Sequence, residues 1–338
     1  MTAGPTFDHL ASLSTPLGLY EHARYAEPRI QHGFCLDDVA RGLVVTAREP
    51  HANAQVRQLA DSYLSFVLAS VYDDGRMHNR RNATGMWTDA ASTDDHWGRA
   101  LWSLGVASCV TDDPSFVQRA REGASKAMKS RSRYSRSMAY AALGAAAILR
   151  MDPSDLPAQR LLVDARPALG MRRNNAAWPW PEDRLTYANA VIPEAMIVTG
   201  EALNDEVLQR DGLVLLEWLA DLQQQDGHLS VIPSAGFAAG DPQPGYAQQP
   251  IEVAALAEAC RAAYVRTGEA RWRKTIAQCL AWFEGANDVG VRMYDEVTGG
   301  GLDGLERGSA NQNQGAESTL AWLSTQQIAL MPQLTGAL

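Results

Sequence analysis

The 338-residue sequence lacks the long hydrophobic runs of a membrane protein. No apolar stretch approaches the roughly 18 to 20 residues that span a bilayer. Residues 1–28 contain acidic and basic side chains but no continuous apolar core of a leader peptide. We therefore expect a soluble, cytoplasmic protein with no membrane partner. A leader removed upstream would leave the same pattern, so secretion stays open.

Metal-binding motifs are also missing. The four cysteines are widely spaced and include no CxxC pair. The seven histidines form neither HExxH nor a comparable ligand spacing. The sequence thus predicts no metal ion and no cofactor.

Positive charge is in short supply. The sequence has 30 Lys and Arg residues and 39 Asp and Glu residues, which gives a formal net charge of −9. The basic residues are dispersed along the chain. A nucleic-acid partner is therefore not expected. Hydrophobic residues make up 46% and charged residues 20%, values of a globular chain that can bury a large core.

Two kinds of helical segment alternate along the chain. One kind is apolar nearly all round and rich in small residues, and the other has a polar face. This alternation predicts an inner and an outer ring of helices. The expected inner helices are 38–48, 95–110, 133–149, 187–201, 249–267 and 316–330, and the expected outer helices are 51–71, 114–129, 157–169, 205–222 and 270–282.

The loops separate into short and long sets. Connections from an inner to the next outer helix are short, whereas most return loops are long and enter the N-terminal ends of inner helices. Ordered loops of such length are usually functional, so we expect the active face at the rim they share. The pattern predicts an all-α (α/α)6 toroid, or six-hairpin barrel. Residues 33–338 would form the toroid, and residues 1–32 an N-terminal extension or the missing outer helix.

Carboxylates recur at the starts of the expected inner helices. Asp37 and Asp94 suit N-caps, whose side chains satisfy free backbone N–H groups. The other carboxylates lie inside apolar helices, where uncompensated burial is costly, so they predict a polar central cavity. Such a cavity separates carboxyl pKa values into an acid and a base, as glycoside cleavage requires. The candidate catalytic residues are Asp38, Asp95, Glu252, Asp303 and Glu317, with Glu252 favoured as general acid because its apolar helix should raise its pKa.

Aromatic and amide side chains concentrate in the long loops. Flat rings stack on sugars, while amides, guanidinium groups and carboxylates bind hydroxyls, although a single Trp more often serves packing. Together they favour an oligosaccharide or polysaccharide substrate. The candidate stacking residues are Trp87, Trp178 and Trp180, and the other candidate binding residues are Arg41, His96, Arg99, Tyr187, Asn189, Tyr246 and Gln249.

Several motifs resemble one family. From residue 33 onward the chain is similar to a bacterial (α/α)6 toroid family that is associated with glycosyltransferases, is described as glycosidase-like and lies within the six-hairpin glycosidase superfamily. The resemblance implies the fold and a carbohydrate substrate. It rests on residues 37–43 (DDVARGL), 95–102 (DHWGRALW), 178–180 (WPW) leading to 185–187 (LTY), 248–252 (QQPIE), 298–305 (TGGGLDGL) and 313–320 (NQGAESTL).

Two positions depart from the pattern of that family. The family motif Thr-Tyr-Asp-Asn-Ala is matched here by residues 186–190 with Ala188 in place of Asp, and Ala247 stands where a similar Asp precedes the Gln-Gln-Pro motif. Either the chain has diverged naturally, or a catalytic carboxylate has been replaced to silence the enzyme.

The sequence thus predicts a glycoside hydrolase with carboxylate acid/base catalysis in the centre of the toroid. Three alternatives remain. A sugar-binding module would need no paired carboxylates. A sugar epimerase or isomerase would need a proton-transfer pair, usually histidines, of which only His96 is placed near an inner helix start. A polysaccharide lyase would need basic groups, such as Arg99, to neutralise a uronic acid.

Overall fold

The computed structural model describes residues 4–109, 113–242 and 245–331. Residue 110, the expected end of one inner helix, and residues 332–338 of the expected toroid domain lie outside the described residues. The inner helices are α2 (Leu36–Ala47), α4 (Asp95–Ala107), α6 (Ser135–Met151), α8 (Val191–Leu203), α10 (Pro250–Thr267) and α12 (Ala316–Ala329).

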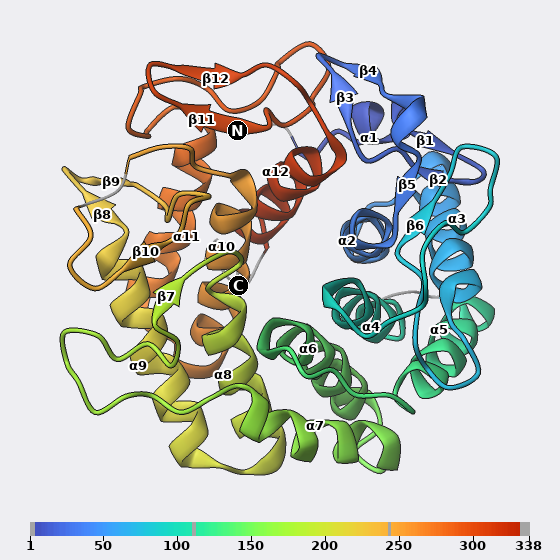
Figure 1. The fold of residues 1–338 in the computed structure, drawn as a ribbon, viewed down its shortest axis with the longest axis horizontal. Helices are drawn as coiled ribbons and strands as arrows, with labels where there is room; N and C mark the ends of the chain where they lie inside the picture. Colours follow the sequence, from blue (N-terminus) through green and yellow to red (C-terminus); the bar gives the residue numbers. More distant parts are fainter. Residues whose placement is uncertain (1–3, 110–112, 243–244, 332–338) are drawn as a thin grey trace.

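These six helices form a closed ring in Figure 1, in which each contacts the next and α12 contacts α2. Five outer helices each pack on the inner helix that precedes them. The prediction of an all-α (α/α)6 toroid is therefore confirmed. At the sixth outer position the five-residue helix α1 (Asp8–Ser12) contacts α12. The outer helices are α3 (Ala54–Ser70), α5 (Pro114–Ala127), α7 (Leu156–Ala168), α9 (Glu206–Leu222) and α11 (Ala270–Phe283).

Side-chain caps start four of the outer helices. Asn53, Asp113, Asp155 and Asp205 each accept hydrogen bonds from backbone N–H groups of the first turn. Each cap satisfies donors that have no partner inside the helix.

The inner helices begin differently, since in the described residues none of their N-cap side chains accepts a hydrogen bond from the first turn. The capping role expected for Asp37 is wrong, because Asp37 is the second residue of α2. Asp94 does occupy the N-cap position of α4, but its carboxylate accepts from the Ser92 hydroxyl at 2.7 Å instead. The N-terminal ends of the inner helices are thus left to face the centre of the rim.

The start of α8 also differs from the prediction. Residues 187–189 were expected in its first turn, yet the helix begins at Val191. Ala188 has a φ of 45°, in the left-handed region that interrupts a right-handed helix. Residues 187–189 therefore belong to the loop at the rim, and the inner helix starts after them.

Short antiparallel strand pairs brace the long loops. One pair joins the segment before α2 to the loop before α4, and another joins the loops that precede α8 and α10. The pairs are β1 (Ser14–Thr15) with β2 (Gly18–Leu19), β3 (Ala23–Arg24) with β4 (Glu27–Pro28), β5 (Phe34–Cys35) with β6 (Arg80–Arg81), β7 (Arg184–Leu185) with β10 (Phe237–Ala238), β8 (Gln224–Gln225) with β9 (His228–Leu229), and β11 (Gly304–Glu306) with β12 (Ser309–Asn311).

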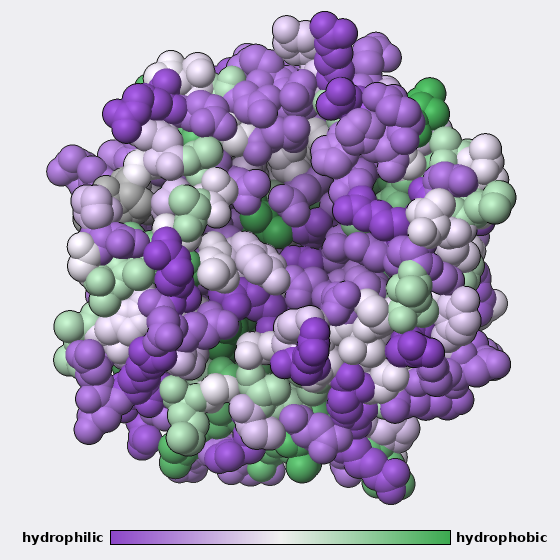
Figure 2. All heavy atoms as spheres, in the orientation of Figure 1, coloured by the Kyte–Doolittle hydropathy of each residue, from purple (hydrophilic) through white to green (hydrophobic). Residues whose placement is uncertain are grey.

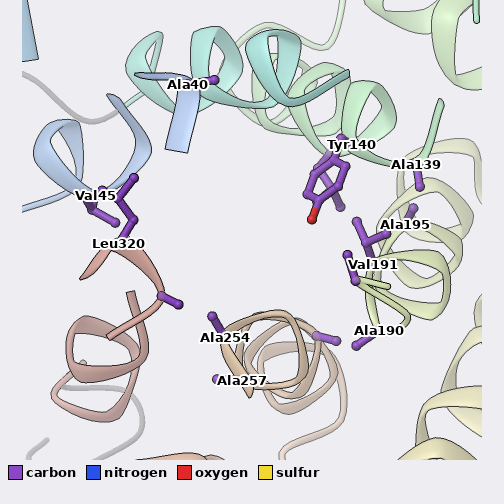
Figure 3. Packing of buried hydrophobic residues seen from close by; sticks show 14 of the residues in the cluster. Ala40, Val45, Ala139, Tyr140, Ala190, Val191, Ala195, Ala254, Ala257 and Leu320 are labelled. Atoms are coloured by element: carbon purple, nitrogen blue, oxygen red, sulfur yellow. The ribbon is translucent and has the colours of Figure 1, made fainter. Parts of the chain in front are cut away.

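Small and aliphatic residues of the inner ring surround the central space. Figure 3 shows Val45, Tyr140, Val191, Ala254 and Leu320 pointing toward it from five different helices. In the described part of the chain, no helix is long and apolar enough to cross a membrane.

The N-terminal segment is fastened to the last inner helix. The backbone N–H groups of Gln314 and Ala316 donate to the carbonyl oxygens of Tyr25 and Glu21, at 2.9 and 3.0 Å, and His9 Nε2 bonds to the Gln314 carbonyl at 2.9 Å. These contacts bring Glu21 to the rim beside α12.

Glycines let α4 and α6 approach closely, so we expect Gly144→Ala to destabilise the protein. A Cβ at Gly144 would lie 2.1 Å from the Leu101 carbonyl oxygen, so the helices would have to separate. We expect a loss of about 2 kcal/mol in the free energy of unfolding, measured by chemical denaturation.

The sign of that change is diagnostic. Without the close contact, Gly to Ala inside a helix would stabilise by up to about 1 kcal/mol. Gly4→Ala, where a Cβ meets nothing within 4 Å, serves as control. A more stable Gly144→Ala variant would contradict the packing described here.

Candidate functional site

A polar cavity of about 450 Å³ opens at the N-terminal ends of α2, α10 and α12. Figure 2 shows this face, where hydrophilic residues surround a central hollow. Its walls come from the inner helix starts, from the region of β11, and from the N-terminal segment. The charged and polar residues that line it include Glu21, His22, Cys35, Asp37, Asp38, Arg41, Arg80, Arg99, Gln249, Asp303, Glu306 and Glu317.

Arg41 holds two carboxylates of the cavity together. Its Nη2 donates to Asp38 Oδ1 at 2.7 Å, one turn earlier on α2, and its Nη1 donates to Glu317 Oε2 at 2.8 Å on α12. The two carboxylates therefore sit on neighbouring nitrogens of one guanidinium group. Arg41 is itself largely buried, which strengthens both ion pairs relative to a surface pair.

Asp38 is the cavity carboxyl with the strongest upward pKa shift that the structure resolves. Burial raises its pKa to about 7, assisted by the negative charges of Glu317 and Glu21 and opposed by Arg41. Its residue is only 3% exposed, yet it lines the cavity, and its Oδ2 has no hydrogen-bond partner in the described residues. Asp38 can thus hold a proton near neutral pH and offer it to a ligand.

A second network links α2 and α4 with the loop before α8. Arg99 Nη1 donates to Asp37 Oδ1 at 2.7 Å and lies 3.7 Å from Asp95 Oδ2, which accepts from the Tyr187 hydroxyl at 2.6 Å. Burial alone would raise the pKa of Asp37, but the Arg99 and Arg41 charges more than offset it and lower that pKa. Asp37 and Asp38 therefore differ in protonation although they are adjacent.

Glu252 holds the loop before α8. Its Oε1 accepts from the Ala188 N–H, and its Oε2 accepts from the Asn189 side-chain amide at 2.9 Å. As the sequence predicts, burial raises the pKa of Glu252, to about 7, against these hydrogen bonds. Glu252 is not among the residues that line the cavity. Its contacts are those of a residue that positions the loop.

Of the other residues predicted for the site, some line the cavity and others lie outside it. Asp303 lines the cavity, and its Oδ1 accepts from the Gly315 N–H at 2.8 Å and the Ser318 hydroxyl at 2.5 Å. Gln249 and Ala247 also line the cavity, whereas Ala188 is fully buried and outside it. The guanidinium group of Arg307 lies over the ring of Tyr246, with its central carbon 5.2 Å from the ring centre.

The tryptophans expected as sugar platforms pack against protein instead. Trp178 and Trp180 are 6% and 0% exposed and contact Trp218 of the outer helix α9. Trp87 stacks on His78 with ring centres 5.2 Å apart and meets Phe66 edge-on. None of the three lines the cavity, so their placement offers no support for stacking on a sugar there.

The histidine expected at the site is also structural in its contacts. His96 is buried and its Nε2 bonds to the Met77 carbonyl at 3.0 Å. A different pair lies at the rim, where His22 and His32 approach with 3.1 Å between their Nδ1 atoms, and His22 lines the cavity.

Sequence reasoning missed several residues of the cavity wall. Glu21 and Arg80 form an ion pair there, and Glu306 stands on β11. Only Asp37 had a signal, because it belongs to the acidic pair at the start of α2, and that pair suggested a cap. Arg80 reaches the cavity through the pairing of β6 with β5, and Glu21 through the hydrogen bond from the Ala316 N–H to its carbonyl oxygen. No local pattern reports either contact.

One group of side chains has the spacing of a metal site. One ligand atom each of Glu21, Cys35 and Asp38 lies within 4.8 Å of the others. Burial, with Asp37 and Asp38 nearby, raises the pKa of the Cys35 thiol well above its usual range. The thiol therefore keeps its proton near neutral pH, and Glu21 and Asp38 are already paired with Arg80 and Arg41.

Below the cavity the central space narrows and becomes apolar. Arg41 and Glu317 border both the cavity and this lower space, and Glu194 and Glu258 reach it from α8 and α10. Glu258 accepts hydrogen bonds from Arg48 at 2.5 Å and from the Ser324 hydroxyl at 2.8 Å. Burial acts to raise its pKa, but the charges of Arg48 and Arg261, with these hydrogen bonds, lower it. Burial and the negative charge of Glu258 raise the pKa of Glu194 to about 8.

Solved structures with the same fold cover nearly the whole chain. A sugar epimerase from a ruminal bacterium has 11% identity and a TM-score of 0.69, over 95% of this chain and 94% of that one. Cellobiose 2-epimerase from Bacillus thermoamylovorans B4167 has 12% identity and a TM-score of 0.68, over 96% and 95%. A cellulase of C. cellulolyticum in complex with cellobiose has 6% identity and a TM-score of 0.63, over 92% and 87%.

These likenesses show that the chain adopts the (α/α)6 glycosidase-like fold. No family model matches the sequence, and no curated protein matches it.

The Glu194 carboxyl predicts a pH-dependent stability. A carboxyl whose pKa is raised by folding contributes stability that is present below its unfolded value, 4.5, and is lost as pH rises through about 8. We expect Glu194→Gln to remove this loss, so that the variant gains stability relative to the wild type on going from pH 5 to pH 9. The relative gain should be on the order of a few kcal/mol in urea unfolding.

The exposed Glu201→Gln on the same helix is the matched control. Parallel pH profiles for wild type and Glu194→Gln would show that Glu194 ionises normally in the folded protein.

Proposed function

We propose that the protein is an enzyme that hydrolyses glycosidic bonds of an oligosaccharide or polysaccharide in the cavity of the toroid. Residues 33–338 form the catalytic domain in this proposal, and residues 1–32 form an extension that supplies part of one wall. The observation that supports it is the pair Asp38 and Glu317 on one guanidinium, at the floor of a polar cavity. Structures of the same fold bear the names of a cellulase and of sugar epimerases, which favours a carbohydrate substrate.

Asp38 acts as general acid in this scheme. Its pKa of about 7 keeps a proton on the carboxyl, and the unpartnered Oδ2 can deliver it to the glycosidic oxygen. The bond between the anomeric carbon and that oxygen then breaks, and the leaving sugar departs with the proton.

Glu317 supplies the second carboxylate. It is half-exposed to the cavity and held in place by Arg41. Attachment of both carboxylates to one guanidinium favours the shorter carboxyl separation, roughly 5 Å, at which the second carboxylate attacks the anomeric carbon and water later releases the sugar. The larger separation of roughly 6.5 to 9.5 Å would instead place a water between them.

The other predicted residues serve this pair. Arg99 and Gln249 face the cavity and would bind hydroxyls, while Asp95 and Tyr187 brace Arg99. Glu252, favoured from the sequence as the acid, becomes a positioning residue that fixes residues 187–189 through its hydrogen bonds.

An epimerase is the second candidate, and the rim pair His22 and His32 favours it. Their Nδ1 atoms lie 3.1 Å apart, and epimerisation needs a proton-transfer pair. The test is exchange of a sugar carbon-bound hydrogen with deuterium from solvent, which hydrolysis does not produce. A lyase is less well supported, because Arg99 and Arg41 are already bound to carboxylates.

The proposed acid gives a pH-dependent prediction. With a screened glycan that releases reducing ends, we expect turnover to fall as pH rises through about 7, where Asp38 loses its proton. Asp38→Asn should lower kcat roughly 100- to 10,000-fold, since an amide cannot donate the proton.

Two variants frame this result. Glu122→Gln, on the exposed face of α5, should leave turnover unchanged. Undiminished turnover in Asp38→Asn, together with its loss in Glu252→Gln, would return the role of acid to Glu252.

The two alanines that depart from the family pattern can be tested separately. We expect Ala247→Asp to raise turnover more than Ala188→Asp, because position 247 lines the cavity. Position 188 is fully buried beside Glu252, where a second carboxylate would be costly. If neither variant gains activity over the parent chain in a reducing-end assay, the idea of a silenced carboxylate fails.

A further inference from the structure

The cavity is lined by more negative than positive groups. Six carboxyl groups, of which Asp38 can hold its proton near neutral pH, stand against three guanidinium groups among the residues that line it. In a recess with low-dielectric walls such an excess concentrates a negative potential. The carboxylates are Glu21, Asp37, Asp38, Asp303, Glu306 and Glu317, and the guanidinium groups are those of Arg41, Arg80 and Arg99.

Every guanidinium group of the cavity is already neutralised by the protein. Arg41 binds Asp38 and Glu317, Arg80 binds Glu21, and Arg99 binds Asp37. A negatively charged sugar would have to displace one of these carboxylates. The cavity is therefore poorly suited to uronic acids or phosphorylated sugars.

Two carboxylates on the wall near β11 lack a cation. Asp303 accepts hydrogen bonds only from uncharged donors, through Oδ1. Glu306 is exposed on β11 and lines the cavity. Neither forms an ion pair with Lys or Arg in the part of the chain that the structure describes.

A third oxygen, Asp38 Oδ2, belongs to a residue that lines the same cavity. The residue is 3% exposed and lines the cavity, and this oxygen has no protein partner among the described residues. A polar atom on so buried a side chain is stabilised when a ligand donates a hydrogen bond to it or accepts one from it.

We infer that the cavity selects sugars that carry a free amine, with the ammonium group held between Asp303 and Glu306. The inference rests on the proposed function and narrows its substrate class to amino sugars that are not acetylated. An ammonium group supplies the missing cation of this wall and three donors for its oxygens. Acetylation removes the charge, so the N-acetyl sugar loses the preference.

Binding tests this inference independently of turnover. The probes are 2-amino and 6-amino forms of glucose, mannose and galactose, their neutral parents, the N-acetyl forms and glucuronic acid, titrated calorimetrically at low ionic strength and slightly acidic pH. We expect at least one amino sugar to bind roughly 5- to 30-fold more tightly than its neutral parent, and glucuronic acid to bind most weakly. Added salt should reduce the preference.

Variants locate the charge that is responsible. Glu306→Gln should reduce the preference for the amine roughly two- to fivefold, while Glu122→Gln on α5 should leave it intact. Asp303→Asn should reduce it as well. Circular dichroism and melting temperature then establish that each variant is folded.

The outcomes separate this inference from the proposed function. If no amino sugar binds better than its neutral parent, or if the preference survives in both Glu306→Gln and Asp303→Asn, the inference is overturned. Cleavage of neutral glycans without an amine preference would leave the hydrolase and remove the amino-sugar class. Tight, salt-sensitive amine binding without cleavage of any glycan would support the amino-sugar class and remove the hydrolase.

Discussion

The ion pairs of Arg41 connect the fold to the chemistry of the site. This one guanidinium joins α2 to α12, the two inner helices that close the ring, and it gathers Asp38 and Glu317 at the floor of the cavity. Because Arg41 is largely buried, removal of both partners would leave a costly uncompensated charge. The same contact thus places the carboxylates and helps to close the toroid, together with the hydrogen bonds of Arg48 and Gln327 between the ends of α2 and α12.

Burial divides the acidic groups of the centre into different protonation states. Asp37 has two guanidinium neighbours and a lowered pKa, whereas Asp38, on the next residue, has a pKa raised to about 7. Deeper in the ring, Arg48 keeps the pKa of Glu258 low while that of Glu194 rises to about 8. In each pair the guanidinium charges outweigh desolvation at one carboxyl, and desolvation outweighs them at the other.

The architecture was predictable because it depends on periodicity. Apolar inner helices, amphipathic outer helices and the lengths of their connections each act locally, and together they define the rings. The boundary at α8 was not predictable, because Glu252 is 64 residues away from Ala188, whose backbone it fixes outside the helix. The same holds for two wall residues. Arg80 is brought to the cavity by the β5–β6 pair, and Glu21 by a hydrogen bond between its backbone and Ala316.

The site was predicted in part. The inner-helix positions of Asp38 and Glu317 followed from the helical pattern, and both line the cavity. The aromatic loop residues were harder, since sequence cannot distinguish a Trp that faces a ligand from one that faces the outer ring. Trp178 and Trp180 find Trp218 there, and a large ring buried against another ring is the more stable choice.

The fastening of the N-terminal segment to residues 314–316 bears on how the chain matures. The Arg41–Glu317 pair spans 276 residues of sequence, and Glu21 reaches the same cavity from still nearer the start. A nascent chain emerging from the ribosome can assemble hairpins of helices in order, but the first and last must wait for one another. Until α12 arrives, the early acidic groups remain in water, so the cavity is complete only after the last inner helix has been made.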